Sequence, residues 1–219
     1  MGFSIYLKMD LFTSAADHQQ KGNCSEKIIL SLPDLDAIYY PNFYSSEEAS
    51  TLFEELKKKT KWQQDDITVY GKTHPQPRLT SFHSLEQMSY SYSGITMDTI
   101  PFSPILVQIK NKIEENIEEK FNAVLLNLYR DGMDSMGWHS DDEKELGKNP
   151  AIASITLGEE RMFHLKHKNN KELKSKLLLQ NGSLLLMKGK TQHFWQHQIP
   201  KSKKVNGSRI NLTFRLIKA

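Results

Sequence analysis

The sequence predicts an α+β fold that is mainly β, with two amphipathic helices followed by a largely antiparallel β-domain. Three observations support this prediction. Apolar residues recur at helical spacing in two segments, within residues 45–59 and 103–121. After residue 121 the period changes to two, and short apolar runs alternate with turn signals such as Asn181-Gly182. Many short strands at this spacing are typical of a β-sandwich, a jelly roll or a barrel.

Length and composition bound the class of protein. The chain has 219 residues, which is typical of one mainly β domain, and 38% of them are apolar, enough for a hydrophobic core. We expect residues 1–27 to form a flexible N-terminal tail and residues 28–219 to form a single domain. The net charge of +3 permits an anionic partner without requiring one. No apolar run approaches the roughly 18 residues of a membrane span, so we expect no membrane association. The sequence carries no signal for oligomerisation, and we expect a monomer by default.

Cys24 is the single cysteine. It excludes an internal disulfide framework and a metal site built from cysteines alone. The absence of a cysteine pair fits a reducing intracellular compartment, the cytoplasm or the nucleus.

The first predicted elements are two short strands and a helix. Ile28–Leu30 and Ala37–Tyr40 are apolar runs bounded by prolines, which is typical of strands. Ser45 and Glu48 have the spacing of a capping box and predict a helix start. Lys57–Lys59 ends this helix, and we interpret the lysines as a solvated C-terminal turn.

Hairpins, a second helix and a series of strands follow. Residues 61–94 are aromatic, polar and rich in turn signals, and they predict hairpins and loops. Ser103-Pro104 begins a helix whose apolar stripe extends to Phe121 and whose acidic side is exposed. The strands predicted beyond it are Ala123–Arg130, Ile152–Leu157, Arg161–His167, Lys176–Leu179, Ser183–Met187 and Arg209–Arg215.

A metal site can use only histidines and carboxylates. His139 and Asp141 are two residues apart, so on an extended segment they project to the same side and can bind one ion. A third ligand must come from elsewhere, and His193 and His197 are both candidates. Two histidines and one carboxylate form the metal-binding triad of non-heme Fe(II) oxygenases. The alternative is a turn in which Asp141 and Asp142 cap backbone donors.

The strand Arg209–Arg215 alternates strictly between apolar and polar residues. Arg209 and Arg215 lie on one side, roughly 20 Å apart along the strand. If this side is buried, the arginines need anionic partners, and a small dicarboxylate would supply them. The alternative is an edge strand whose polar side faces water.

A second strand adds polar groups of the same kind. The segment Ala123–Arg130 is apolar on both sides, which favours a central position, yet Asn127 and Tyr129 share one side of it. Buried polar groups need partners, and either a ligand carboxylate or a neighbouring strand could provide them.

Three motifs in this order resemble the AlkB family of Fe(II)- and 2-oxoglutarate-dependent dioxygenases. The resemblance covers residues 66–217. Its strongest parts are Asn127-Leu128-Tyr129-Arg130-Asp131-Gly132, His139-Ser140-Asp141-Asp142-Glu143 and Arg209-x-Asn211-x-Thr213-Phe214-Arg215.

The resemblance implies a double-stranded β-helix (jelly-roll) core over residues 122–217, supported by N-terminal helices. It implies that His139, Asp141 and His197 bind Fe(II) and form the catalytic centre. It also implies a set of residues that hold 2-oxoglutarate: Asn127, Tyr129, Arg209 and Arg215, with Asn211 and Thr213 on the same side. The implied reaction is oxidative demethylation, which releases succinate, carbon dioxide and formaldehyde.

The resemblance further implies a methylated nucleic acid as substrate, with N1-methyladenine and N3-methylcytosine in DNA, and RNA as a second polymer. Residues 66–94 would form nucleotide-recognition hairpins. The implied substrate contacts are Tyr70, Arg78, Tyr90, Tyr92 and Glu143. Parts of the sequence resemble single-strand-acting members and parts resemble duplex-acting members, so strand preference stays open. Two alternatives remain: the same chemistry on a protein or lipid substrate, and a non-catalytic binding module.

Overall fold

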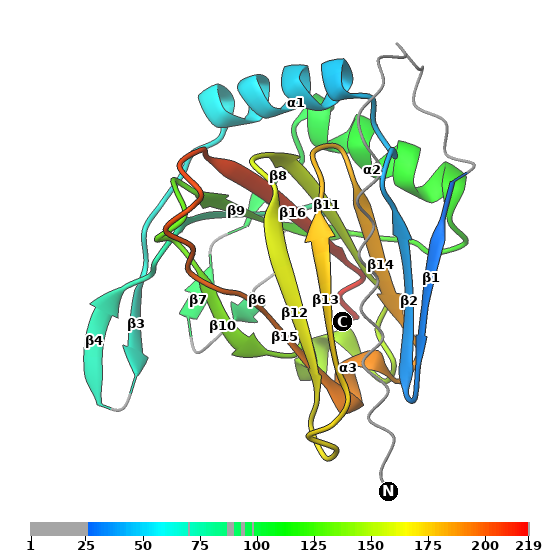
Figure 1. Cartoon of the computed structure of the whole chain (residues 1–219). Coiled ribbons are helices and arrows are strands. Elements are labelled where there is room, and N and C mark those ends of the chain that lie inside the picture. Colours follow the sequence, from blue (N-terminus) through cyan, green and yellow to red (C-terminus); the bar gives the residue numbers. More distant parts are fainter. Residues whose placement is uncertain (1–25, 70, 87–89, 93–94, 98, 219) are drawn as a thin grey trace, which may run out of the picture.

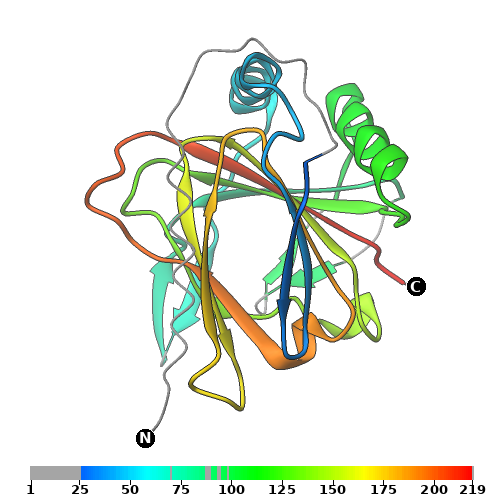
Figure 2. The same ribbon diagram turned by 45° about the vertical axis from the view of Figure 1, so that its right-hand side comes forward.

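The computed structural model describes residues 26–218 except residues 70, 87–89, 93–94 and 98; for residues 68–69, 90–92 and 95–97 it describes the backbone alone. Two β-sheets face each other, and two long helices pack on the outer side of the larger sheet (Figures 1 and 2). The mainly β fold class is therefore confirmed. The predicted tail, residues 1–27, lies almost entirely outside the described residues.

The large sheet has eight strands. In spatial order they are β1 (Ile28–Leu32), β2 (Leu35–Tyr40), β14 (Leu184–Lys188), β11 (Ile152–Gly158), β16 (Arg209–Arg215), β9 (Ala123–Tyr129), β5 (Leu79–Ser84) and β8 (Ile100–Pro101). All the pairings are antiparallel except the short one between β5 and β8. Strand β9 is central, as its apolar content predicts, and β16 lies beside it, which excludes the edge-strand alternative for β16.

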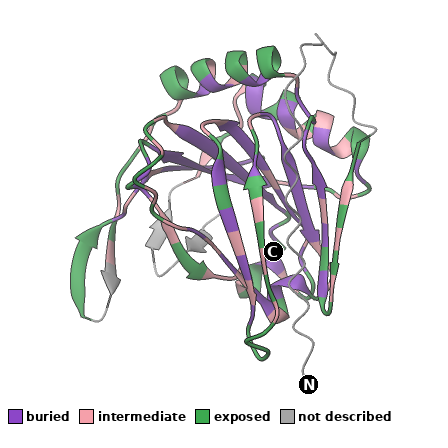
Figure 3. Ribbon diagram, in the orientation of Figure 1, coloured by how far each residue is buried: buried purple, intermediate pink, exposed green. Residues whose placement is uncertain are grey.

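The small sheet has four strands. In spatial order they are β10 (Met136–His139), β15 (Trp195–Ile199), β12 (Arg161–His167) and β13 (Lys174–Leu179). Two hairpins lie outside these sheets, β3 (Asp66–Val69) with β4 (Lys72–Pro75) and β6 (Tyr90–Tyr92) with β7 (Ile95–Met97). The first hairpin projects from the body of the protein, and its β4 strand is exposed throughout (Figures 1 and 3).

The helices begin where the sequence predicts. Helix α1 (Ser46–Lys59) has a full capping box: the Ser45 hydroxyl accepts from the Glu48 amide, and the Glu48 carboxylate accepts from the Ser45 amide. Helix α2 (Pro104–Asn116) ends earlier than its apolar stripe suggests. Beyond the end of α2 the chain is held to the helix by Glu114, whose carboxylate accepts from the backbone amide of Phe121 at 2.9 Å.

Two apolar clusters divide the interior. One lies between the large sheet and helices α1 and α2, and the other lies between the two sheets. Strand β16 contributes to both layers, because Ile210, Leu212 and Phe214 point to the helices while its polar residues point to the small sheet. Its seven residues are all buried (Figure 3).

Some elements differ from the sequence prediction. The large sheet extends beyond residues 122–217, since β1, β2, β5 and β8 add to it. Residues 66–94 are not hairpins throughout, because β5 pairs with β9 inside the large sheet. Strands β10 and β15 and the short helix α3 (Thr191–Phe194) have no counterpart in the prediction, and each is short and carries polar residues. No helix in the described part of the chain has the length and apolar character needed to cross a membrane.

Candidate functional site

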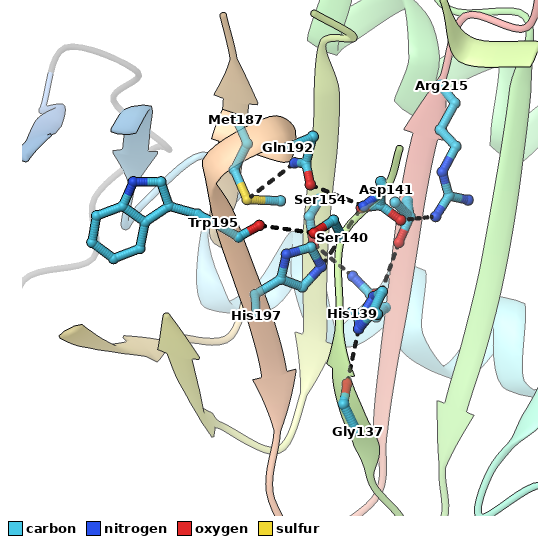
Figure 4. Close-up of polar contacts among 12 residues, drawn as sticks. Gly137, His139, Ser140, Asp141, Ser154, Met187, Gln192, Trp195, His197 and Arg215 are labelled. Carbon is cyan, nitrogen blue, oxygen red and sulfur yellow. Dashed lines mark hydrogen bonds and ion pairs between the residues drawn. The ribbon is translucent and has the colours of Figure 1, made fainter. Parts of the chain in front are cut away.

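The small sheet brings two histidines and an aspartate together. His139 ends β10 and pairs in register with His197 at the centre of the antiparallel strand β15. Their ring centroids are 4.2 Å apart, and Asp141 follows two residues after His139. One ligating atom from each of these three residues lies within 4.8 Å of the others, which is the geometry needed to hold one ion (Figure 4). Alternation along β15 turns His197 inward, whereas His193 is exposed on α3, so the structure favours His197 of the two candidates.

The protonation states of these side chains suit a divalent metal. Burial lowers the pKa of His197 to about 3 and also lowers the pKa of His139, so both imidazoles are neutral at pH 7. His139 Nδ1 lies 2.9 Å from the Gly137 carbonyl, which can only accept; Nδ1 therefore donates, and Nε2 is the free ligand atom. Neutral imidazole and carboxylate are the forms that bind metals.

Asp141 is an anion held by a cation. Burial alone would raise its pKa, but the guanidinium of Arg215 lies 2.6 Å from Oδ1 and holds the pKa of Asp141 well below its usual range. The other oxygen, Oδ2, is 3.6 Å from His197 Nε2. One carboxylate oxygen is thus paired with Arg215, and the other faces the histidines.

The backbone of the Asp141 segment is fixed by groups from β15 and α3. The Asp141 amide donates to Gln192 Oε1 at 2.9 Å, and the Ser140 hydroxyl donates to the Trp195 carbonyl at 2.9 Å (Figure 4). Lys168 Nζ donates to the carbonyl of Gln192 at 2.9 Å and holds the turn in place. Gln192 is 1% exposed, so its contact with Asp141 is shielded from water. No sequence signal marks Gln192, because a glutamine in a short turn has no periodicity.

A cavity lies beside this trio, between the two sheets. The space between its walls, together with its opening to solvent, amounts to about 490 Å³. The small sheet contributes His139, Phe163 and His197, among others, to the wall of this cavity. The large sheet contributes polar residues to the opposite wall: Asn127, Tyr129, Ser154, Arg209, Asn211, Thr213 and Arg215. All six residues implied to hold 2-oxoglutarate are therefore brought to one cavity.

Arg209 is the feature of this wall that most clearly points to an anionic ligand. It is 1% exposed, and its Nη2 donates to the Thr156 hydroxyl at 2.9 Å. Its Nε and Nη1 are buried without a hydrogen-bond partner among the described residues. Burial lowers its pKa to about 10, so it remains a cation at neutral pH. A buried cation with two free donors fits a ligand carboxylate.

The neighbouring polar residues of the wall are already partnered. Asn211 donates to the Ser154 hydroxyl at 2.7 Å, and the Thr213 hydroxyl donates to Asn211 Oδ1 at 2.9 Å. Ser154 is absent from the sequence prediction, although Ser154 and Thr156 in an apolar strand are the same signal that singles out Asn127 and Tyr129. These contacts orient the wall and leave the donors of Arg209 for a ligand.

The structure describes only some of the side chains that the resemblance implies to contact the substrate. Tyr70 lies outside the described residues, and Tyr90 and Tyr92 are described in backbone only, within β6. The resemblance to the AlkB family implies that Arg78 lies on a recognition hairpin. It is instead 4% exposed, just before β5, and its Nε donates to Asn127 Oδ1 at 2.7 Å. The expected position is wrong because the hairpin ends at Pro75 and the chain then enters the large sheet.

Glu143 lies close to the trio in sequence and is half-buried. Burial raises the pKa of its carboxyl, and its Oε2 has no hydrogen-bond partner among the described residues. A carboxyl group in this state can accept a hydrogen bond from a ligand amine.

Comparisons with known proteins agree with this geometry. Residues 36–215 match the 2OG-Fe(II) oxygenase superfamily. The chain is 42% identical over 186 residues to alpha-ketoglutarate-dependent dioxygenase alkB homolog 3 of Bos taurus, covering 81% of this chain and 64% of that protein. It is 35% identical over 188 residues to DNA oxidative demethylase ALKBH2 of Homo sapiens, covering 81% of this chain and 72% of that protein. The matched region thus spans just under two thirds of the length of the alkB homolog 3 relatives.

A solved structure supports the fold. The structure of OsALKBH1 matches with a TM-score of 0.56 at 19% identity, over 82% of this chain and 96% of that one. The family implies Fe(II) and 2-oxoglutarate as cofactor and co-substrate, and the residues present fit both. The trio His139, Asp141 and His197 offers the ligands of a non-heme iron, and Arg209 offers free donors to a carboxylate. This chain belongs to the AlkB family of the 2OG-Fe(II) oxygenase superfamily.

Proposed function

We propose that this protein removes methyl groups from N1-methyladenine and N3-methylcytosine in DNA, with RNA as a further substrate, and so reverses alkylation damage directly. The observation that carries the proposal is the metal-ligand trio facing the same cavity as the free donors of Arg209. The relatives named DNA oxidative demethylase support the substrate class. Such an enzyme would act in the cytoplasm or the nucleus, as a monomer.

His139, Asp141 and His197 would hold Fe(II). Bound Fe(II) would couple the oxidative decarboxylation of 2-oxoglutarate, to succinate and carbon dioxide, to the insertion of one oxygen atom from O₂ into a C–H bond of the N-methyl group. The resulting hydroxymethyl group leaves as formaldehyde, and the ring nitrogen regains its unmethylated form.

The residues of this chain would orient the metal ligands and bind 2-oxoglutarate. The Gly137 carbonyl holds His139 with Nε2 available, and Arg215 and Gln192 hold Asp141 by its side chain and its backbone. Arg209 would bind a carboxylate of 2-oxoglutarate, with Asn127 and Tyr129 as further contacts in the same wall.

Glu143, Arg78, Tyr70, Tyr90 and Tyr92 are proposed to recognise the modified nucleotide. The free oxygen of Glu143 would accept from the exocyclic amine that adenine and cytosine share. Arg78 is buried and would act only indirectly, by fixing the side chain of Asn127, to which it donates a hydrogen bond. The tyrosines would stack on or flank the base.

The test follows a single modified base by mass. The protein is first reconstituted with Fe(II) under anaerobic conditions. It then receives 2-oxoglutarate, oxygen and an oligonucleotide that carries one N1-methyladenine. We expect a product lighter by one CH₂, with one succinate formed per methyl removed.

Two histidines from one segment provide a matched pair of variants. His197→Gln removes a proposed ligand and should abolish the product, whereas His193→Gln changes an exposed residue four positions away and should leave the rate unchanged. Succinate without a change in the oligonucleotide would assign the dioxygenase chemistry to another substrate, such as a protein or a lipid. If metal-loaded protein forms neither succinate nor demethylated oligonucleotide, the proposed function is contradicted.

A further inference from the structure

The outer side of the small sheet, turned away from the cavity, gathers positive charge. Phe163 and Leu165 of β12 are buried toward the cavity side, so His164 and Lys166 point outward. The register with β13 places Lys176 opposite His164 and Lys174 opposite Lys166. We call Trp138, His164, Lys166, Lys174 and Lys176 together the basic face.

The charge of the whole chain is concentrated on this hairpin. Residues 161–179, which form β12, β13 and their turn, contain six lysines and arginines and one glutamate, a formal charge of +5. The complete chain has a net charge of +3, so the remaining residues together carry −2. The mild overall charge therefore conceals a strongly basic hairpin, although Arg161 is buried and Lys168 is paired with Asp142. A concentrated charge of this kind attracts polyanions.

The lysines of the basic face lack a counter-charge within the described part of the chain. Lys166, Lys174 and Lys176 form no ion pair with any residue that the structure describes. Like charges directly opposite each other on neighbouring strands destabilise a sheet, and Lys166 and Lys174 are such a pair. Stability of the fold alone gives no reason for this arrangement. An anionic partner lying across the two strands would supply one.

The basic face also contains an exposed aromatic ring next to the candidate site. Trp138 is 37% exposed on β10, and Lys166 Nζ lies 4.3 Å from the centre of its ring. Trp138 directly precedes His139, so the basic face begins on the back of the strand that carries a proposed metal ligand. Lysines beside an exposed aromatic ring are the combination that single-stranded nucleic-acid surfaces use.

We propose that the basic face binds the phosphate backbone of the nucleic acid whose modified base occupies the cavity. This inference rests on the proposed function, because it assigns the partner of the face to the polymer on which the enzyme acts. Lys174 and Lys176 are two residues apart on one side of β13, roughly 6.6 Å along the strand, and can contact different phosphates. The contacts are electrostatic and independent of base sequence.

The test is a triple variant, Lys166→Gln, Lys174→Gln and Lys176→Gln, whose binding to a fluorescent single-stranded oligonucleotide is followed by anisotropy over a range of KCl concentrations. If each lysine releases its share of counterions, the slope of log affinity against log salt falls by about 2. Affinity near 0.1 M salt then falls by about 10- to 100-fold.

The matched control is Lys57→Gln, Lys58→Gln and Lys59→Gln on α1. It removes the same charge, but Lys57 already bonds to Ser208 and Lys59 to Glu55, and α1 lies on the far side of the large sheet (Figure 1). We expect oligonucleotide affinity within about twofold of the wild type, because distant charges are screened. Circular dichroism melting of both variants checks that they are folded.

A short substrate separates this inference from the proposed function. A trinucleotide carrying N1-methyladenine has only two internucleotide phosphates and so offers few contacts to the basic face. The Lys166, Lys174, Lys176 variant should therefore demethylate it at a rate close to that of the wild type. If the wild type demethylates nothing and forms no succinate, the proposed function fails, and the binding experiment still tests the face. If the triple variant binds the long oligonucleotide as the wild type does, the basic face is not a phosphate contact. If the triple variant loses binding to phosphatidylserine vesicles but keeps its binding to the oligonucleotide, the inference is also overturned, in favour of a membrane partner.

Discussion

The two sides of the large sheet are made by the same strands and have opposite chemistry. On β16 the side chains of Ile210, Leu212 and Phe214 face the helices with 0% exposure. The intervening side chains face the cavity and are polar: Arg209, Asn211, Thr213 and Arg215. Residues on both sides are buried, so burial alone does not distinguish a stabilising residue from a functional one.

The difference lies in how each side meets its partners. The helix side is satisfied by apolar packing, which stabilises the fold without any ligand. The cavity side places the cation of Arg209 in the interior with donors left free, which costs stability until a ligand arrives. Substitutions on the two sides should therefore have opposite effects on stability and on ligand binding.

The largest effect on stability is expected at Phe214. Its ring is fully buried and makes edge-to-face contacts with Phe102 and Phe121, at centroid distances of 6.4 and 6.2 Å. Phe214→Ala should lower the free energy of unfolding by about 3–5 kcal/mol, through lost burial and the cavity left behind. Urea denaturation measures this change. Phe214→Leu keeps more volume and should lose less; equal losses would argue against a packing role.

The second prediction concerns the opposite side of the same strand. Arg209→Met removes the free donors and the buried charge while keeping a long side chain. We expect affinity for 2-oxoglutarate to fall by about 100-fold, which corresponds to ~2.7 kcal/mol. The thermal midpoint of the ligand-free protein should stay the same or rise, because an apolar residue replaces a buried cation of which two donors lack partners among the described residues. Isothermal titration with 2-oxoglutarate and scanning calorimetry provide the two measurements.

Arg209→Lys is the control for this prediction. It keeps the positive charge and loses the planar pair of donors, so it should retain part of the affinity. If Arg209→Met destabilises the ligand-free protein as strongly as Phe214→Ala does, the contrast between the two sides of the sheet is wrong.

The cavity side of the sheet is also the part of the molecule that the sequence predicts best. Strict alternation in Arg209–Arg215, and the pair Asn127 and Tyr129 in an apolar strand, mark residues that line the cavity. His139 and Asp141 are predicted together because a spacing of two on an extended segment is itself geometric. The period of a strand thus predicts which residues share a side, but not whether that side is buried, since the edge-strand alternative for Arg209–Arg215 was excluded only by the pairing of β16.

Other features depend on contacts between distant segments and have no local signal. The choice of His197 over His193 requires the pairing of β15 with β10, although the resemblance to the AlkB family also indicates it. The position of Arg78 depends on the end of the β3–β4 hairpin and the entry of β5 into the large sheet. Gln192 is positioned only by the fold of α3 against the Asp141 segment.

The third prediction tests that last contact. Gln192→Met keeps the side-chain length but removes the oxygen that accepts from the Asp141 amide. We expect metal affinity to fall by about 10-fold, because groups that orient a metal ligand typically contribute 10- to 100-fold. Co(II) titration measures the affinity, and a change in the visible absorption of bound Co(II) reports altered ligand geometry.

Thr191→Val is the matched control, since it changes the neighbouring residue of the same turn. The Thr191 hydroxyl accepts from the Asp36 amide and donates to the Asp36 carbonyl, so it holds α3 to β2 without touching the Asp141 segment. This variant should lower the thermal midpoint and leave Co(II) affinity and absorption unchanged. If both variants weaken Co(II) binding equally, the turn as a whole is responsible and Gln192 has no separate positioning role.

The smallest effect is expected on the helix side, at Glu114. Burial alone would raise the pKa of its carboxyl, but the Phe121 amide and the ammonium groups of Lys110 and Lys120 outweigh burial and lower it. Because the folded-state pKa lies below the unfolded one, the stabilisation is present above the unfolded value of about 4.3 and disappears as pH falls through the folded value. Urea unfolding of the wild type and Glu114→Gln between pH 7 and pH 3 should therefore show a stability difference that narrows with acidification. A difference that is constant with pH would mean that the charge of Glu114 does not stabilise the end of α2.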